Sequence, residues 1–234
     1  MSHSAKVARV GPRPLVTIHL AQSLDGRLGI EGSTTLLSTP EGRAYAHATR
    51  AAHDAVLVGS STVRIDDPRL TVRAAKGADP LRVVLSSTLA IPRNARVLAG
   101  PHSSARPRAL VIGAEGVARD DERRALEAAG VAVAIAPKSN DGRVSIDGAL
   151  AILAERGVQR LLVEGGGKVV TSFLSAHAVD AMSVEISMRM LGAPGTPMLG
   201  PLGIDTIGEA PALANVVVER LGSNVLVRGD VVHA

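Results

Sequence analysis

Short apolar runs rich in Val, Ile, Leu and Ala alternate with Ala-, Arg- and Glu-rich stretches along most of the 234-residue chain. Each apolar run has the length of a single strand, and the stretches between them have helical character. Such an alternation is typical of a mainly parallel sheet that helices cover on both faces. The pattern therefore predicts an α/β fold, and no other feature of the sequence constrains the fold as strongly.

The individual elements follow from the same pattern. We expect strands at Leu15–Ala21, Ala55–Val58, Leu81–Leu85, Ala109–Ile112, Val131–Ile135, Arg160–Val163 and Ala181–Ile186. Helices are expected at Thr39–Ala52, Asp120–Ala129, Asp147–Arg156 and Lys168–Ala176. Two late runs, Asn215–Arg220 and Asn224–Arg228, have no helix between them and predict an antiparallel hairpin at the sheet edge. Because no repeat or linker divides the chain, we expect one domain over residues 15–234, after a disordered or extended tail of residues 1–14.

Composition excludes several classes of protein. Hydrophobic residues make up 46% of the chain, whereas a disordered chain has low hydrophobicity and high net charge. Cysteine is absent, which excludes a disulfide scaffold, thiolate metal ligands and a cysteine nucleophile. The seven His form no H-x-x-x-H or H-E-x-x-H pair, so we expect no metal site. No run approaches the ~20 apolar residues of a membrane span, and a cytoplasmic protein without membrane contact is expected.

The basic character of the chain comes almost entirely from arginine. There are 22 Arg and 4 Lys, yet the net charge is only +4. The arginines are spread along the sequence, and Tyr45 and Phe173 are the only aromatic residues. A nucleic-acid-binding protein would need a basic stripe with stacking platforms, so we expect none here. Arginine is, however, the better fork for phosphate and carboxylate groups.

Two glycine turns follow predicted strands. One is Gly59-Ser60-Ser61-Thr62, and the other is Glu164-Gly165-Gly166-Gly167. Glycine lets the backbone approach a ligand closely, and the following helix offers free N–H donors. These turns either serve only to reverse the chain or bind the phosphates of a nucleotide, and the presence of two favours the nucleotide. Neither matches the dinucleotide fingerprint or the P-loop.

Three other features could carry chemistry. The stretch Arg64–Arg73 packs two carboxylates and three arginines into ten residues, and it is either a solvated loop or the lip of a substrate site. The turn Ser23-Leu24-Asp25-Gly26-Arg27 follows the first strand, where α/β sheets place ligands. His19 lies inside an apolar strand, as either a core histidine or a functional one. A serine hydrolase is unsupported because no G-x-S-x-G motif exists.

Together these segments resemble a known family. The turn Ser23–Arg27, the block from Val58 through Asp66-Asp67-Pro68 to Arg73, and Val163–Gly167 are similar to motifs of the pyrimidine reductases of riboflavin biosynthesis. This reductase forms the C-terminal domain of a bacterial bifunctional deaminase/reductase and is a stand-alone enzyme in archaea and fungi. The likeness runs from about Leu15 to the C-terminus.

The resemblance implies a dihydrofolate-reductase-like fold with a mostly parallel sheet, a homodimer, and NADPH as the hydride donor. It implies reduction of the ribosyl side chain of a 5-amino-6-(5-phosphoribosylamino)pyrimidine to ribityl. The implied contacts to the cofactor are Ser38 and Thr39 on the nicotinamide side, Ser86 at the adenosine end, and Gly59, Ser61, Thr62, Gly165, Gly166 and Gly167 at the phosphates. The implied contacts to the substrate are Thr34, Arg50, Asp67, Arg73 and Glu164, with Arg50 and Arg73 clamping its phosphate.

Reduction also needs a proton, and we expect Asp67 or His19 to supply it. Two positions depart from the family. Fused bacterial members usually carry Lys where this chain has His19, and an aromatic residue often stands where it has Leu36. These departures keep two alternatives open: a reductase of the same fold for another pterin or pyrimidine, and a non-catalytic NADP-binding protein. The zinc deaminase motifs are absent, so we expect no deamination.

Overall fold

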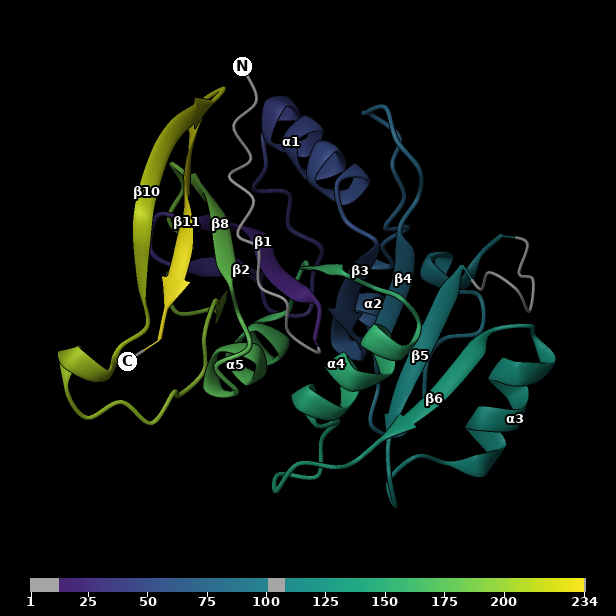
Figure 1. Cartoon of the computed structure of the whole chain (residues 1–234). Coiled ribbons are helices and arrows are strands. Elements are labelled where there is room, and N and C mark those ends of the chain that lie inside the picture. The colour runs from purple at the N-terminus through teal and green to yellow at the C-terminus, as the bar shows by residue number, and fades with distance from the viewer. Residues whose placement is uncertain (1–12, 101–107, 234) are drawn as a thin grey trace.

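The computed structural model describes residues 13–100 and 108–233, and a nine-stranded sheet forms its centre (Figure 1). The strand order is β10-β11-β8-β1-β7-β3-β4-β5-β6. Strands β8 to β6 in this order run parallel, whereas β10 and β11 form an antiparallel hairpin at one edge. The predicted α/β architecture with an antiparallel C-terminal edge is confirmed.

The bounds of the elements are as follows. The large sheet consists of β1 (Leu15–Ser23), β3 (Ala55–Gly59), β4 (Leu81–Leu85), β5 (Ala109–Ala114), β6 (Ala132–Ala136), β7 (Arg160–Val163), β8 (Ala181–Ser187), β10 (Ala212–Leu221) and β11 (Asn224–Val232). A small sheet pairs β2 (Arg27–Ile30) with β9 (Gly195–Pro197). The helices are α1 (Pro40–Ala51), α2 (Ser60–Asp66), α3 (Asp120–Ala128), α4 (Ile146–Glu155) and α5 (Gly167–Ser175), with 3₁₀ turns at Arg96–Leu98 and Ile207–Glu209.

Each strand and helix expected from the sequence is present, with small shifts at its ends. The small sheet is new, because β2 is four residues long and pairs with a segment far away in the chain. The stretch Arg64–Arg73 is a helix end followed by a loop, since α2 continues as far as Asp66.

Local capping explains where two of the helices begin. The Thr39 hydroxyl accepts the N–H of Gly42 at 3.0 Å, and Pro40 occupies the first turn of α1. The Ser145 hydroxyl likewise accepts the N–H of Gly148 at 3.3 Å at the start of α4. A side-chain oxygen at this position satisfies an N–H that has no partner within the helix.

The sheet separates two clusters of buried apolar side chains. Leu57 and Val83 belong to the cluster under α4 and α5, whereas Val56 and Val84 belong to the one under α2 and α3. Successive residues of a strand point to opposite faces, so these strands are buried on both sides. Phe173 of α5 is the largest fully buried side chain.

Helix α1 covers a polar part of the sheet instead. Its buried residues are Gly42 and His47, and below it β1 and β8 present the buried side chains of His19, Ser183 and Glu185. The opposite face of β1 carries Ile18 and its neighbours in the apolar cluster. The interface between α1 and the sheet therefore depends on hydrogen bonds as well as on apolar packing.

Of the predicted tail, residues 1–14, the structure describes only the last two. Of these, Arg13 forms a double ion pair with Asp180, at 2.8 and 3.1 Å. No helix in the described part of the chain is long and apolar enough to cross a membrane. The division into a tail and one domain stays a prediction.

Candidate active site

The two glycine turns come together at the carboxyl edge of the parallel strands. Strands β3 and β7 are neighbours, so the turns that follow them meet. The N–H of Gly59 donates to the carbonyl of Gly165 at 3.3 Å. A Cβ built on Gly166 would lie 3.0 Å from the Thr62 hydroxyl. Both motifs that the sequence singled out for a nucleotide therefore belong to one surface.

The glycines of these turns are required for two different reasons. Gly165 and Gly166 have φ values of +112° and +49°, which side chains rarely allow, and a Cβ on Gly165 would meet nothing within 4 Å. A Cβ on Gly59 would lie 2.8 Å from Val169, and one on Gly167 would lie 2.6 Å from the Pro197 carbonyl. There is thus open space on the side of Gly165 where a side chain would stand, although the residue itself is buried, whereas Gly59 and Gly167 serve packing.

Arg50 and Glu164 form a largely buried ion pair beside this turn. The Nε of Arg50 lies 2.6 Å from one Glu164 oxygen, and its Nη2 lies 2.7 Å from the other. The side chains are 15% and 10% exposed. Glu164 directly precedes Gly165, so the pair joins α1 to the glycine turn. The Nε–Nη2 edge of Arg50 is therefore occupied by Glu164, and the expected clamp of Arg50 and Arg73 on a phosphate stays a prediction.

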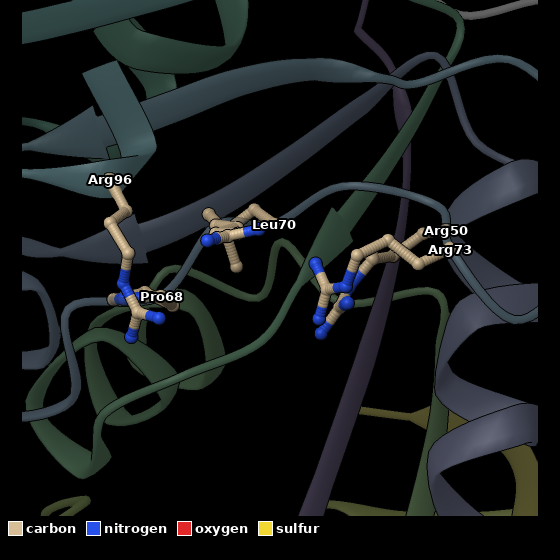
Figure 2. A pocket seen from close by; sticks show the side chains of 6 residues that line it. Arg50, Pro68, Leu70, Arg73 and Arg96 are labelled. Carbon is tan, nitrogen blue, oxygen red and sulfur yellow. The ribbon is translucent and has the colours of Figure 1, made fainter. Parts of the chain in front are cut away.

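A cavity of about 270 Å³ opens next to Arg50, lined by Arg50, Pro68, Arg69, Leu70, Arg73 and Arg96 (Figure 2). Figure 2 shows the side chains of Arg50 and Arg73 side by side, with Arg96 across the cavity beside Pro68. Burial and the like charges of the other three arginines lower the pKa of Arg73. Four guanidinium groups around one space repel each other, and an anion between them relieves that repulsion.

Asp67 is held as a structural residue at the lip of this cavity. Its carboxylate accepts the backbone N–H of Arg96 at 2.7 Å and the Nε of Arg96 at 3.0 Å. Its backbone lies in the left-handed region, with φ +39°, where α2 ends. These bonds fix Arg96 in the cavity wall, so Asp67 contributes to the cavity through Arg96.

The neighbouring Asp66 has surroundings different from those of Asp67. Partial burial of its carboxyl group raises the pKa, although the residue as a whole is exposed, and the nearby Thr34 side chain opposes that shift. The Thr34 hydroxyl donates to the carbonyl of Ile65 at 3.0 Å. Thr34, a predicted substrate contact, and α2 therefore lie together. The sequence showed two adjacent carboxylates here, and only their surroundings distinguish them.

His19 and Ser86 are more deeply buried than a ligand contact requires. His19 is 4% exposed, its Nδ1 lies 2.9 Å from the Ser183 hydroxyl, and its ring lies 5.2 Å from that of Tyr45. Burial lowers the pKa of His19, which favours the neutral ring. Ser86 is 3% exposed at the end of β4. Both residues support the site from beneath its surface.

A second hollow of about 350 Å³ lies at the start of α1. Its walls are Leu36, Leu37, Ser38, Thr39, Ser187, Met188, Arg189, Ser223 and Asn224. It contains both residues expected on the nicotinamide side, Ser38 and Thr39. It also contains Leu36, whose side chain is 68% exposed, at the position where the family often has an aromatic residue.

The turn Ser23–Arg27 is a structural clamp. The carboxylate of Asp25 accepts the Ser23 hydroxyl at 2.5 Å and the N–H groups of Leu191 and Gly192 at 3.0 and 2.7 Å. These bonds lower the pKa of Asp25 to about 2. The motif connects the β1–β2 turn to the loop that follows β8. This structural role accounts for Ser23 and Asp25 without any contact to a ligand.

The structure adds residues that the sequence did not indicate. Arg96 reaches the cavity from a 3₁₀ turn beyond β4, and nothing in the pattern around it distinguishes it from the other arginines. Glu185 and Asn224 support the second hollow from β8 and β11. Within residues 13–100 and 108–233, no group of three or more His, Cys, Asp or Glu side chains is placed to hold a metal ion.

Comparisons with known sequences relate the chain to one family. The model of the RibD C-terminal domain family matches residues 14–227. The riboflavin biosynthesis protein RibD of Aquifex aeolicus is 33% identical over 217 residues, which are 92% of this chain and 57% of that protein. A relative from Archaeoglobus fulgidus named 2,5-diamino-6-ribosylamino-4(3H)-pyrimidinone 5′-phosphate reductase is 34% identical over 196 residues, 79% of this chain and 85% of its own length.

Solved structures share the fold. RibD of Acinetobacter baumannii superposes with a TM-score of 0.77 at 22% identity, over 95% of this chain and 59% of that one. The riboflavin biosynthesis reductase Rib7 of yeast, Saccharomyces cerevisiae, superposes with a TM-score of 0.74 at 21% identity, over 96% and 93%. The chain thus covers little more than half the length of these RibD proteins, but nearly the whole length of Rib7.

Proposed function

Because the chain belongs to the RibD C-terminal domain family, we propose that it is an NADPH-dependent reductase acting on a 5-amino-6-(5-phosphoribosylamino)pyrimidine, whose ribosyl side chain becomes ribityl. One observation carries the proposal: the arginine-lined cavity and the glycine turn are joined by the Arg50–Glu164 pair. An anion site for substrate thus lies beside a surface suited to the phosphates of a cofactor. The name of the Archaeoglobus relative supports the substrate class.

The cofactor would lie along the carboxyl edge of the sheet. Gly165, Gly166 and Thr62 would receive its phosphates, because no atom fills the space beside Gly165 where a side chain would stand, and the Thr62 hydroxyl is adjacent to Gly166. Ser38 and Thr39 would line the nicotinamide end in the second hollow. NADPH, when bound, supplies a hydride.

The arginine cavity would hold the substrate phosphate. It is smaller than the roughly 300–1,000 Å³ that buries a whole drug-sized ligand, so it takes one end of the substrate. Arg73 has one side-chain hydrogen bond, to the Thr71 hydroxyl, whereas the guanidinium groups of Arg50 and Arg96 are already bound, to Glu164 and to Asp67. Charge-assisted bonds from these groups would fix the sugar in place.

Asp66 would supply the proton. Reduction of the opened ribosylamine adds one hydride and one proton, so an acid must stand near the sugar. The side chain of Asp66 forms no ion pair within the described residues, and partial burial raises the pKa of its carboxyl group, whereas Asp67 is bound to Arg96. His19 is buried under α1, so it would influence the reaction only through the groups beside it, such as Ser183 and Tyr45.

The test is oxidation of NADPH, followed at its absorbance maximum, with the deaminated and non-deaminated ribosylaminopyrimidine phosphates and with dihydrofolate. Turnover with either pyrimidine is the expected result. Turnover with dihydrofolate alone would instead favour a reductase of another pterin. Tight NADPH binding without turnover on all three would favour a non-catalytic NADP-binding protein.

We also propose that the enzyme is a homodimer through the sheet edge. Strand β10 is ten residues long and stands at the open edge of the large sheet, where Figure 1 shows it at one end of the molecule. Val216 and Val218 on it are 50% and 63% exposed. A long apolar edge strand is a template for pairing with another chain. Light scattering of wild type and Val218→Lys tests this, and a monomeric wild type would refute it.

A further inference from the structure

The least expected group in the buried part of the molecule is the carboxylate of Glu185. Its residue is 0% exposed in the middle of β8, and its Oε2 is buried without a hydrogen-bond partner. A buried polar atom without a partner costs about 1–3 kcal/mol. An apolar side chain at position 185 would avoid that cost. The carboxylate must therefore have a role that depends on its other oxygen.

The other oxygen, Oε1, holds the segment that leads into α1. It accepts the backbone N–H of Thr39 at 3.0 Å and the side-chain amide of Asn224 at 2.7 Å. The same amide donates to the carbonyl of Leu37 at 2.9 Å, and the Thr39 hydroxyl donates to the carbonyl of Leu221 at 2.9 Å. Residues 37–39 are therefore attached to the sheet through their backbone on both sides of Ser38.

The geometry around Gly42 shows that the carboxylate fills its site completely. A Cβ on Gly42 would lie 2.1 to 2.3 Å from the carboxyl atoms of Glu185. Gly42 does not have a positive φ and lies inside a helix, where alanine would otherwise stabilise the fold by about 1 kcal/mol. The glycine is thus explained by the room that Glu185 needs.

We propose that Glu185 is a positioning residue that sets the affinity for the nicotinamide half of the cofactor, by holding residues 37–39 as one wall of the second hollow. The inference rests on the proposed function for the identity of the ligand. Glu185 touches no ligand itself, since Thr39 and Asn224 stand between it and the hollow. This role depends on an acceptor oxygen at Oε1 and not on the negative charge of Glu185, because the Thr39 N–H and the Asn224 amide that donate to it are neutral groups.

The decisive variants are Glu185→Ala and Glu185→Gln. We expect Glu185→Ala to raise the KM and the Kd for NADPH by about tenfold or more, as loss of a buried acceptor does, with little change in the KM for the pyrimidine. Glu185→Gln keeps an oxygen at Oε1 and should restore NADPH affinity to within about threefold of wild type. Val184→Ala, on the apolar face of the same strand, is the control for a loss of stability alone.

A second pair of variants keeps the test independent of folding defects. Gly42→Ala should weaken NADPH binding in the wild-type background, because it displaces the carboxylate. In the Glu185→Ala background the same change should have no further effect on NADPH binding and should raise Tm. Equal effects of Gly42→Ala in both backgrounds would refute the coupling.

Amide exchange separates this inference from the proposed function. The Thr39 N–H should exchange about tenfold or more faster in Glu185→Ala than in wild type without any cofactor, and Val184→Ala should leave it slow. If wild type fails to oxidise NADPH while this result holds, the proposed function fails and the positioning of residues 37–39 stands. Unchanged exchange, or Glu185→Gln as defective as Glu185→Ala, would overturn the inference.

Discussion

Replacing Arg73 by methionine tests the arginine cavity most directly, because stability and ligand binding should respond in different ways. In the free protein, partial desolvation and three neighbouring arginines disfavour the charge of Arg73, as its lowered pKa indicates, although the residue is exposed. Its side chain has one hydrogen bond, to the Thr71 hydroxyl at 2.6 Å, at an exposed position. We therefore expect Arg73→Met to keep or raise the Tm of the free protein.

Binding of a phosphate should respond strongly. A hydrogen bond to a charged group contributes about 1.5–3 kcal/mol, so loss of Arg73 should weaken ribose 5-phosphate binding about 10- to 150-fold. At a ligand concentration of 100 times the wild-type Kd, wild type gains about 2.7 kcal/mol, or about 5–11 °C in Tm for a chain of this size. A variant with a Kd 100 times higher gains only about 0.4 kcal/mol, or about 1–2 °C.

The assay is thermal unfolding with and without ribose 5-phosphate, at constant ionic strength, for wild type, Arg73→Met and Arg124→Met. Arg124 lies on α3, exposed and away from the cavity, so its replacement should leave the ligand-induced shift unchanged. An equal shift for wild type and Arg73→Met would refute the assignment of the cavity as the phosphate site. A marked loss of Tm in free Arg73→Met would refute the argument from charge repulsion.

Three further predictions concern carboxylates. Asp66→Asn should lower kcat about 10²- to 10⁴-fold, as loss of a general acid does, whereas Asp67→Asn should act mainly on the KM of the pyrimidine, and steady-state kinetics distinguishes the two. Glu164→Gln should cost about 2–4 kcal/mol in urea unfolding, because breaking a buried pair costs about 3–5 kcal/mol and Arg50 keeps a little exposure. The pKa of Asp25 is lowered to about 2 in the folded protein, so its contribution to folding stability is present above pH ~4 and is lost as pH falls towards 2. Asp25→Asn should therefore flatten the dependence of Tm on pH between pH 4 and pH 2.

Each of these has its own counter-result. Equal kcat values for Asp66→Asn and wild type would remove Asp66 as the acid. Glu155→Gln is a control for Glu164→Gln, since Glu155 is exposed and forms no ion pair within the described residues, and equal unfolding energies for the two variants would contradict the buried pair. A Tm profile of Asp25→Asn parallel to that of wild type from pH 4 to pH 2 would show that the Ser23–Arg27 clamp has no electrostatic part.

The order and type of the main elements could be predicted because local patterns specify them. Thr39, Pro40 and Glu41 mark the start of α1, and the glycine turns mark the ends of β3 and β7. Strand β2 could not be predicted, because four residues specify no strand until Gly195–Pro197 pairs with them. For the same reason, the resemblance indicated residues near the site but not how they pair with one another.

Arg50 shows the limit most clearly. The family resemblance implied a contact of Arg50 with the substrate phosphate, but nothing in the sequence indicated that Arg50 also pairs with Glu164, 114 positions away. Asp66 and Asp67 are adjacent and chemically identical in the sequence, and only Thr34 and Arg96 give them different environments. Partners that lie far apart in the chain have no signature in a single sequence.

By itself, then, the sequence determined the α/β alternation, the two glycine turns and the family, since each depends on residues that are close together in the chain. The tertiary structure alone decided which arginines face the cavity, which of two adjacent carboxylates is bound to Arg96, and that Glu185 lies under Gly42. The physical reason is that charge and hydrogen bonding act through space. The role of a carboxylate therefore depends on the atoms that folding brings into contact with it.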